Sequence, residues 1–157
     1  MKSLILILLL SVTCFANDAS ERYPNPALTP GKVTPVTKEV LCQHGYTATV
    51  RFVSEATKKE VFKRYGIPLD KRSNYEVDHF ISLELGGLND IENLWPQIYC
   101  PVGNKPDVSD CYGAREKDRV ETNLNHRICA GTITMQQAQD IIKTDWVAEY
   151  KKIVGAK

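Results

Sequence analysis

The chain has 157 residues, of which 43% are apolar and 25% are charged. This length suits a single domain and this apolar fraction suffices for one ordinary core, which excludes a repeat array and a disordered chain. The 20 basic residues face 19 acidic ones, so bulk charge gives no reason to expect nucleic-acid binding, and any such contact must come from a local patch.

The first 16 residues have the pattern of a secretory signal peptide: a lysine, an apolar run from Leu4 to Leu10, and small residues ending at Ala16. The run is too short to span a bilayer comfortably. We therefore expect a secreted or periplasmic protein with no membrane contact after cleavage. A lipoprotein anchored at Cys14 is the alternative, although Thr13 is a poor match to the small residue that such processing prefers.

Signal removal leaves four cysteines, Cys42, Cys100, Cys111 and Cys129, and 19 of the 20 basic residues against 19 acidic ones. An even cysteine number in an oxidising compartment predicts two disulfides. Cys100 and Cys111 bracket a loop-like segment rich in Pro, Gly, Asn and Asp, and their pairing would leave Cys42 for Cys129. The other two pairings stay open. A zinc site has less support, because no Cys-x-x-Cys or Cys-x-x-His spacing occurs.

Residues 17–37, rich in proline and threonine, predict an extended arm or linker that wraps the domain or frays, and residues 38–157 form the predicted domain. Gly45 to Val53 alternates and is rich in β-branched and aromatic residues, which predicts a strand. Ser54 then caps a predicted helix over Ala56–Tyr65. Its basic side chains form either a solvated face or a phosphate-contacting face: Lys58, Lys59, Lys63 and Arg64.

The central stretch predicts two strands joined by a glycine turn. A strand begins at Tyr75 and ends near the Asp78-His79 pair, because apolar and polar residues alternate there. The pair Gly86-Gly87 permits a turn with positive φ. The sequence Asn-Leu-Trp-Pro-Gln, starting at Asn93, then predicts the returning strand, with its proline near an edge.

Two helices complete the predicted α+β fold. Ala114–Ile128 has apolar residues at helical spacing. Thr134 opens a capping box and an amphipathic helix that runs to about Val154. The predicted buried face of this last helix is Ala138, Ile141, Ile142, Trp146 and Tyr150.

The residue types around His79 suit phosphodiester cleavage. That reaction needs a general base for water and a cation for the phosphate charge. A neutral His79 can accept the proton near neutral pH. Asp78 points the opposite way on a strand, so we expect a local break that brings both groups to one ion. Asn93 is expected to hold the turn through its side chain. Alone, the pair could also be structural, with Asp78 orienting a histidine at a strand end.

The segments YEVDHFISLELGGLNDIENLWPQ, AREKDRVETNLNHRIC and AQDIIKTDW resemble the HNH nuclease superfamily, in particular small exported bacterial HNH-type proteins. The resemblance covers about Pro26 to Trp146. It implies a ββα-metal core, here with an additional N-terminal strand and helix and a C-terminal amphipathic helix. It also implies that His79 is the general base, Asp78 the first metal ligand and Asn93 the bracing asparagine. Glu76 matches a position that is often acidic in colicin-type nucleases, and we include it among the catalytic residues.

The chain departs from the family pattern on the helix, where an HNH protein has His or Asn as another metal ligand. Asp118 and Glu121 share a helix face, and Mg²⁺ prefers such oxygen ligands, although Mn²⁺ or Zn²⁺ are alternatives. Lys117 and Arg115 are the expected phosphate contacts. His126 is expected to pack or hydrogen-bond.

The sequence thus predicts an exported, divalent-metal-dependent endonuclease that acts on DNA, or alternatively on RNA. A second hypothesis is a non-catalytic exported module that binds nucleic acid or protein and retains the HNH scaffold. The unsettled ligand on the helix keeps that second hypothesis open.

Overall fold

The computed structural model describes residues 22–100 and 111–155 of the chain. The predicted signal peptide, the first residues of the predicted arm and most of the Cys100–Cys111 loop lie outside these ranges. The described residues form a small α+β fold with a two-stranded antiparallel sheet and several helices, so the predicted fold class is confirmed at this level.

The sheet is the predicted central hairpin. Strand β1 (Tyr75–His79) pairs with β2 (Leu94–Ile98), in a register that places Tyr75 opposite Ile98 and His79 opposite Leu94. Pro96 stands opposite Val77. Its missing N–H costs the ladder nothing on the open side of a two-stranded sheet. Both predicted strands are therefore confirmed.

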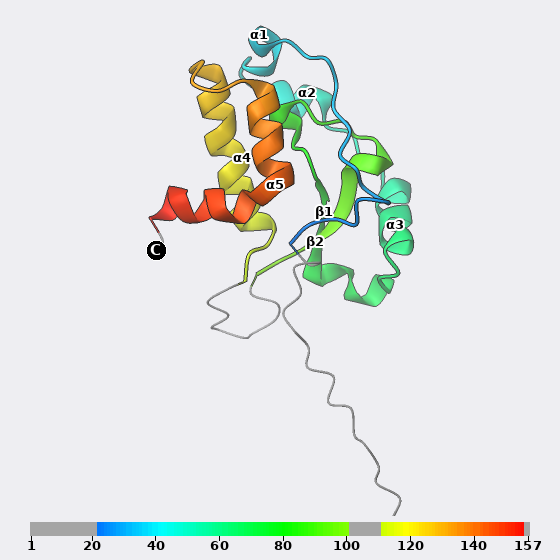
Figure 1. Cartoon of the computed structure of the whole chain (residues 1–157). Helices are drawn as coiled ribbons and strands as arrows, with labels where there is room; N and C mark the ends of the chain where they lie inside the picture. The colour runs from blue at the N-terminus through cyan, green and yellow to red at the C-terminus, as the bar shows by residue number, and fades with distance from the viewer. Residues whose placement is uncertain (1–21, 101–110, 156–157) are drawn as a thin grey trace, which may run out of the picture.

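Helices cover both sides of this sheet. In Figure 1, α4 and α5 lie beside one another on one side of the hairpin and α3 lies on the other. The helices are α1 (Lys38–Leu41), α2 (Tyr46–Val50), α3 (Glu55–Arg64), α4 (Ala114–Cys129) and α5 (Met135–Val154), with 3₁₀ turns η2 (Leu69–Asn74), η3 (Leu83–Leu85) and η4 (Ile91–Asn93).

The predicted helix starts are confirmed by their caps. The Ser54 hydroxyl accepts a hydrogen bond from the Thr57 N–H at the start of α3. At the start of α5, Thr134 and Gln137 form the reciprocal capping box. Each cap pairs backbone N–H groups that have no partner inside the first turn of a helix.

The strand predicted over Gly45–Val53 is wrong. Gly45 has φ of +82° and starts the short helix α2, and α2 ends where Arg51 turns extended. Tyr46 and Val50, four residues apart, both lie half-buried on one side of that turn. Strand preference reflects packing against a neighbouring strand, and the sheet of the described residues contains only β1 and β2.

The last helix is also less regular than predicted. It bends at Asp145, whose backbone is extended (φ −161°, ψ 76°), and the final segment turns away in Figure 1. Asp145 Oδ1 accepts hydrogen bonds from Ala148 N at 2.9 Å and from the Tyr23 hydroxyl at 3.1 Å. Asp145 therefore caps the second half of α5, so the residues assigned to one helix form two helical pieces.

The described part of the predicted arm, from residue 22 onward, wraps the domain. The Trp146 indole N–H donates to the Arg22 carbonyl at 2.9 Å. The Thr29 hydroxyl donates to the Leu94 carbonyl, also at 2.9 Å. Further along, Val33 forms an isolated bridge with Gly87. The arm thus connects the bend of α5 to the strand β2 and the glycine turn.

The core lies between the sheet, α4 and α5. Trp146 and Ile142, predicted for the buried face of α5, are fully buried, whereas Ile141 and Tyr150 are half-buried. Trp95 of β2 is also buried. The central apolar cluster consists of Leu41, Phe80, Ile81, Leu85, Trp95, Val120, Leu124, Ile128, Ala138, Ile142, Trp146 and Val147.

Both predicted disulfides are present. Cys42 pairs with Cys129 across 87 positions of sequence, and Cys100 pairs with Cys111. Two disulfides are compatible with a protein of the cell exterior or periplasm. Among the described residues, none of the helices has the length and apolar character needed to cross a bilayer.

The double glycine has two distinct structural reasons. Gly86 has φ of +84°, which favours glycine. At Gly87 the constraint is space, because a Cβ atom there would lie 1.8 Å from the Ile81 carbonyl oxygen and 2.9 Å from Asn93 Nδ2. Only glycine lets the two chain segments approach this closely beside the end of β1.

We expect Gly87→Ala to lower the free energy of unfolding by at least about 2 kcal/mol, because backbone must move to admit the methyl group. Gly45→Ala is the matched control. Unlike Gly87, Gly45 has positive φ, but no atom lies within 4 Å of its added Cβ, so the substitution should cost only about 1 kcal/mol. Urea unfolding of the disulfide-bonded proteins measures both values. Equal losses would contradict the steric argument.

Candidate functional site

The two residues of the Asp78-His79 pair leave β1 on opposite faces. β1 continues through His79, so the predicted local break is not present. Neighbouring side chains on a strand alternate between faces. Asp78 contacts Lys117 of α4, whereas His79 contacts Asn89 of the glycine turn. The structure therefore places the two groups in two different environments.

On the α4 side, the Lys117 side chain is completely buried and its ammonium is surrounded by oxygen atoms. Nζ donates to Asp78 Oδ2 at 2.7 Å and to the His79 carbonyl oxygen at 2.8 Å. It also donates to the Glu121 carboxylate, one turn along α4. An ammonium has three donors, and here all three are used.

The opposite charges of Lys117 and its two carboxylate partners stabilise one another. Burial lowers the pKa of Lys117, but the carboxylates of Asp78 and Glu121 outweigh burial and raise it above the usual value, so the side chain is cationic. Burial raises the pKa of Glu121, and Lys117 opposes that rise. A buried charge is tolerated only with such partners, because removing one partner leaves the other uncompensated.

The ligand set predicted for a divalent ion does not fit that ion with the side chains as they stand. Asp78 and Glu121 both bond to the Lys117 ammonium. Asp118 lies on the exposed side of α4 and borders a separate pocket with His126. Within residues 22–100 and 111–155, there is no group of three or more His, Cys, Asp or Glu side chains with metal-binding geometry.

On the other face of β1, the His79 imidazole has a defined orientation. Its Nε2 lies 3.0 Å from Asn89 Oδ1. The Asn89 amide is itself fixed, because Nδ2 donates to the Val50 carbonyl at 2.7 Å and Oδ1 accepts from Phe52 N. Oδ1 can only accept, so Nε2 must carry the proton in neutral His79. Nδ1, which hydrogen-bonds to no other described residue, then keeps the basic lone pair.

The surroundings of His79 favour this neutral form. Burial lowers the pKa of His79 below its ordinary value of 6.5, and the hydrogen bond to Asn89 and the charge of Asp78 oppose that shift only in part. His79 is 3% exposed as a whole, yet it contributes to the wall of a cleft. A neutral imidazole beside a cleft can accept a proton from water.

Asn93 has the bracing position that was predicted for it. Its side chain is fully buried: Nδ2 donates to the Ile81 and Leu88 carbonyls at 2.9 and 2.8 Å, and Oδ1 accepts from Ile81 N at 3.0 Å. Asn93 thereby connects the segment after β1 to the glycine turn. The same turn carries Asn89, so Asn93 holds the partner of His79 in place.

The cleft beside His79 has a volume of about 600 Å³ and lies along β1, α3 and η2. Aromatic side chains, Tyr75 and Tyr99, line part of it. Phe52, next to the cleft residue Arg51, is 79% exposed. The charged residues that line the cleft are Arg51, Lys58, Lys59, Arg72, Glu55 and Glu76. Basic groups outnumber acidic ones there, although the chain as a whole is nearly neutral.

The remaining predicted site residues have different positions. Glu76 lines the cleft, and burial together with the charges of Asp78 and Asp118 raises its pKa. The Arg115 guanidinium lies 5.7 Å from the ring centroid of Tyr99, at the border of the cleft. Lys117 is fully buried, so the prediction that it contacts a substrate phosphate is wrong for this structure.

The basic cluster predicted on α3 is divided by the structure. Lys58 and Lys59 line the cleft, and Lys58 also pairs with Glu55. Lys63 is exposed. Arg64 donates to the backbone carbonyls of Leu28 and Ile91 and so holds the arm.

Sequence reasoning missed Asn89 and Arg51. Asn89 follows the double glycine by two positions, in a Leu-Asn-Asp turn that reads as ordinary turn composition. Its contact with His79 depends on how the turn folds back on β1. Arg51 lay inside the wrongly predicted strand, and the available signal in the sequence was a basic residue next to an aromatic one, Phe52.

Comparison of the chain with protein-family models, with curated proteins and with solved structures finds no match.

We expect Asn93→Ala to lower the free energy of unfolding by at least about 3 kcal/mol, because it leaves the buried Ile81 N–H and carbonyl and the half-buried Leu88 carbonyl without partners. Asn25→Ala is the control. Asn25 is exposed and its side chain makes one local hydrogen bond to Ala27 N, so the loss should stay below about 1 kcal/mol. Thermal and urea unfolding measure both. Similar losses would mean that Asn93 is not the brace of this turn.

Proposed function

We propose that this chain is an exported HNH-type endonuclease that hydrolyses phosphodiester bonds of DNA, with His79 as general base. The observation that carries the proposal is the oriented His79 imidazole in the wall of a cleft with a surplus of basic side chains. The order β1, glycine turn, β2 and α4, with Asn93 as brace, agrees with the ββα arrangement that the sequence resemblance implies. The predicted signal peptide and the two disulfides support export.

In the proposed reaction, a water molecule in the cleft gives its proton to His79 Nδ1. The water oxygen attacks phosphorus as the bond from phosphorus to the leaving oxygen breaks. Arg51, Lys59 and Arg72 offset the negative charge of the phosphate. The leaving oxygen takes a proton from solvent water, and Glu76, whose pKa is raised mainly by burial, borders the same cleft.

The cleft favours contact with the nucleic-acid backbone over base-specific recognition. Arginine and lysine side chains bind phosphates of any sequence, and such binding weakens as salt rises. Phe52 is exposed and follows the cleft residue Arg51 in sequence, so it can add stacking on bases. The predicted Mg²⁺ is not part of this proposal, because two of its predicted ligands bond to Lys117.

A non-catalytic exported binding module is the second candidate function. The observation that favours it is again Lys117, which bonds to Asp78 and Glu121, two of the three carboxylates predicted as metal ligands. Such a module would use the same basic cleft for nucleic acid. It differs from the nuclease in one measurable respect, since it binds a labelled oligonucleotide without cleaving it.

We expect His79→Ala to slow nicking of supercoiled plasmid by at least about 100-fold, the usual minimum contribution of a general base. His126→Ala is the matched control, because His126 is exposed on α4 away from the cleft and its loss should leave the rate unchanged. Equal nicking by His79→Ala and wild type would contradict the assigned base. Oligonucleotide binding without nicking by the wild type, with any added ion, would favour the binding module.

The pH dependence of cleavage should report His79. Only the neutral imidazole is a base, and its pKa lies below 6.5, so kcat/KM should rise with pH and reach half of its plateau below pH 6.5. Asn89→Asp keeps an acceptor for Nε2–H but adds a negative charge, which raises the pKa of His79 and moves the midpoint to higher pH. An equal midpoint in the wild type and in Asn89→Asp would show that the contact between Asn89 and His79 does not affect the pKa that controls cleavage.

A further inference from the structure

We propose that the Lys117 ammonium is the resident cation between β1 and α4, in place of a divalent ion, and that removing it converts this centre into a divalent-cation site. What this inference implies for catalysis rests on the proposed nuclease function. Its structural part concerns only Asp78, Lys117, Glu121 and the His79 carbonyl.

The atoms around Lys117 Nζ are those of a hard-cation site. Two carboxylates and one backbone carbonyl converge on a single point from two elements, β1 and α4. Oxygen atoms of these types are the ligands that Mg²⁺, Ca²⁺ and Mn²⁺ prefer. Here they converge on a positive charge that belongs to the chain itself.

Lys117 and a divalent ion exclude each other at this point. The Lys117 side chain is 0% exposed and the Asp78 side chain 12%, so the ammonium cannot turn into solvent without opening the contact between α4 and β1. Two cations sharing the same carboxylates would repel strongly in an environment with little water. Divalent-ion binding therefore requires that Lys117 lose its charge or leave.

Because Lys117 excludes a divalent ion, the buried lysine and the basic residues of the cleft have different tasks. Lys117 holds Asp78, Glu121 and the carbonyl end of β1 in position, but it is too deeply buried to touch a substrate. In the proposed nuclease, the phosphate charge must then be met by basic groups of the cleft, such as Arg51 and Arg72. Lys117 is accordingly a positioning residue.

The test uses the purified disulfide-bonded chain and Mn²⁺ as the probe. Electron paramagnetic resonance counts bound Mn²⁺, and thermal unfolding with Mn²⁺ or with a chelator measures the linked stability. The wild type should bind no Mn²⁺ at this centre and should melt at the same temperature under both conditions. Lys117→Met should bind one Mn²⁺ at least about tenfold more tightly than the wild type, and Mn²⁺ should raise its melting temperature.

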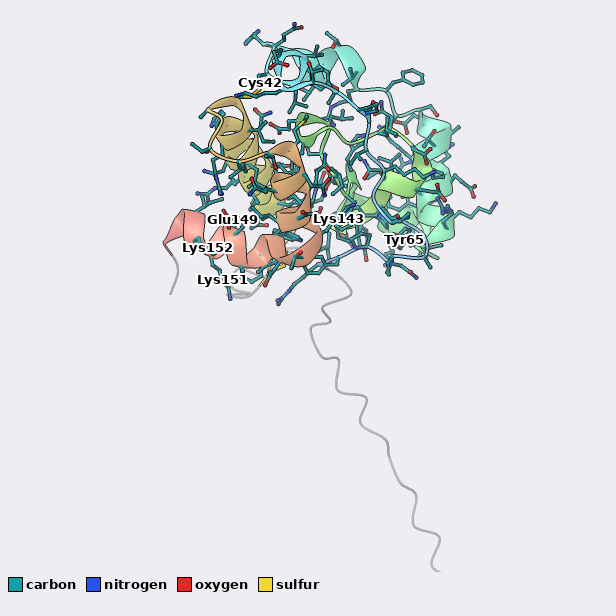
Figure 2. The ribbon with its side chains drawn as sticks, turned by 45° about the horizontal axis from the view of Figure 1, so that its top comes forward. Cys42, Tyr65, Lys143, Glu149, Lys151 and Lys152 are labelled. Carbon is teal, nitrogen blue, oxygen red and sulfur yellow. A yellow bond between two sulfur atoms is a disulfide. The ribbon has the colours of Figure 1, made fainter. Side chains whose placement is uncertain are left out.

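Two further variants keep the test decisive. Lys117→Met leaves two carboxylates buried without their cation and can fail to fold. The double variant Lys117→Met with Glu121→Gln has one buried carboxylate fewer, so we expect it to fold more readily. It should bind Mn²⁺ more weakly than Lys117→Met but more tightly than the wild type. Lys152→Met is the surface control. Lys152 pairs with Glu149 near the end of α5 (Figure 2), and its removal should create no Mn²⁺ site.

Stoichiometric Mn²⁺ binding by the wild type that Asp78→Asn abolishes would overturn the inference. A folded Lys117→Met protein that binds no Mn²⁺ would overturn it as well. These results are separate from cleavage. Mn²⁺ binding as expected without any nicking would remove only the nuclease proposal, whereas nicking that needs an ion at Asp78 would remove only this inference.

Discussion

The contact between Lys117 and β1 is the interaction on which the rest of this structure depends. One ammonium joins the middle of α4 to Asp78 and to the carbonyl end of the strand, in a place without water access. A buried ion pair of this kind adds little net stability compared with apolar residues of the same size, but it tolerates only one arrangement of its partners. This requirement constrains the packing of α4 on the sheet, and the alternation of side chains along β1 then directs His79 to the opposite face.

Strand β1 therefore separates Asp78 and His79, which the sequence predicts to act together at one metal ion. Asp78 faces inward and maintains the scaffold, while His79, one residue later, faces the cleft and its basic groups. Two asparagines support the cleft side of the strand. Asn89 orients the His79 imidazole, and Asn93 holds the glycine turn that carries Asn89. A single turn after β1 thus contributes to the cleft wall and sets which ring nitrogen of the neutral histidine carries the proton.

Much of the fold could be predicted from the sequence because local signals and tertiary packing agree. Strands β1 and β2, the cap of α3 at Ser54 and the capping box at Thr134 follow from nearest neighbours in sequence. The residues of α2 could not be assigned correctly, because β-branched side chains prefer strands only where a strand partner exists. In the candidate site, too, local sequence features could be predicted and tertiary contacts could not. Asn93 was found from its motif, whereas the burial of Lys117 and the contact of Asn89 arise from elements that are distant in sequence and meet only in the folded chain.

The disulfide between Cys42 and Cys129 has a consequence for survival among proteases. Its 87-position span makes a covalent ring that contains both strands and all of α4, and therefore Asp78, His79 and Lys117. In the unfolded chain such a ring removes about 4 to 5 kcal/mol of loop entropy, which favours refolding after a local opening. A single cut within the ring also leaves both pieces attached to each other. A chain built this way can be nicked in a surface turn and still keep its two sets of site residues on one molecule.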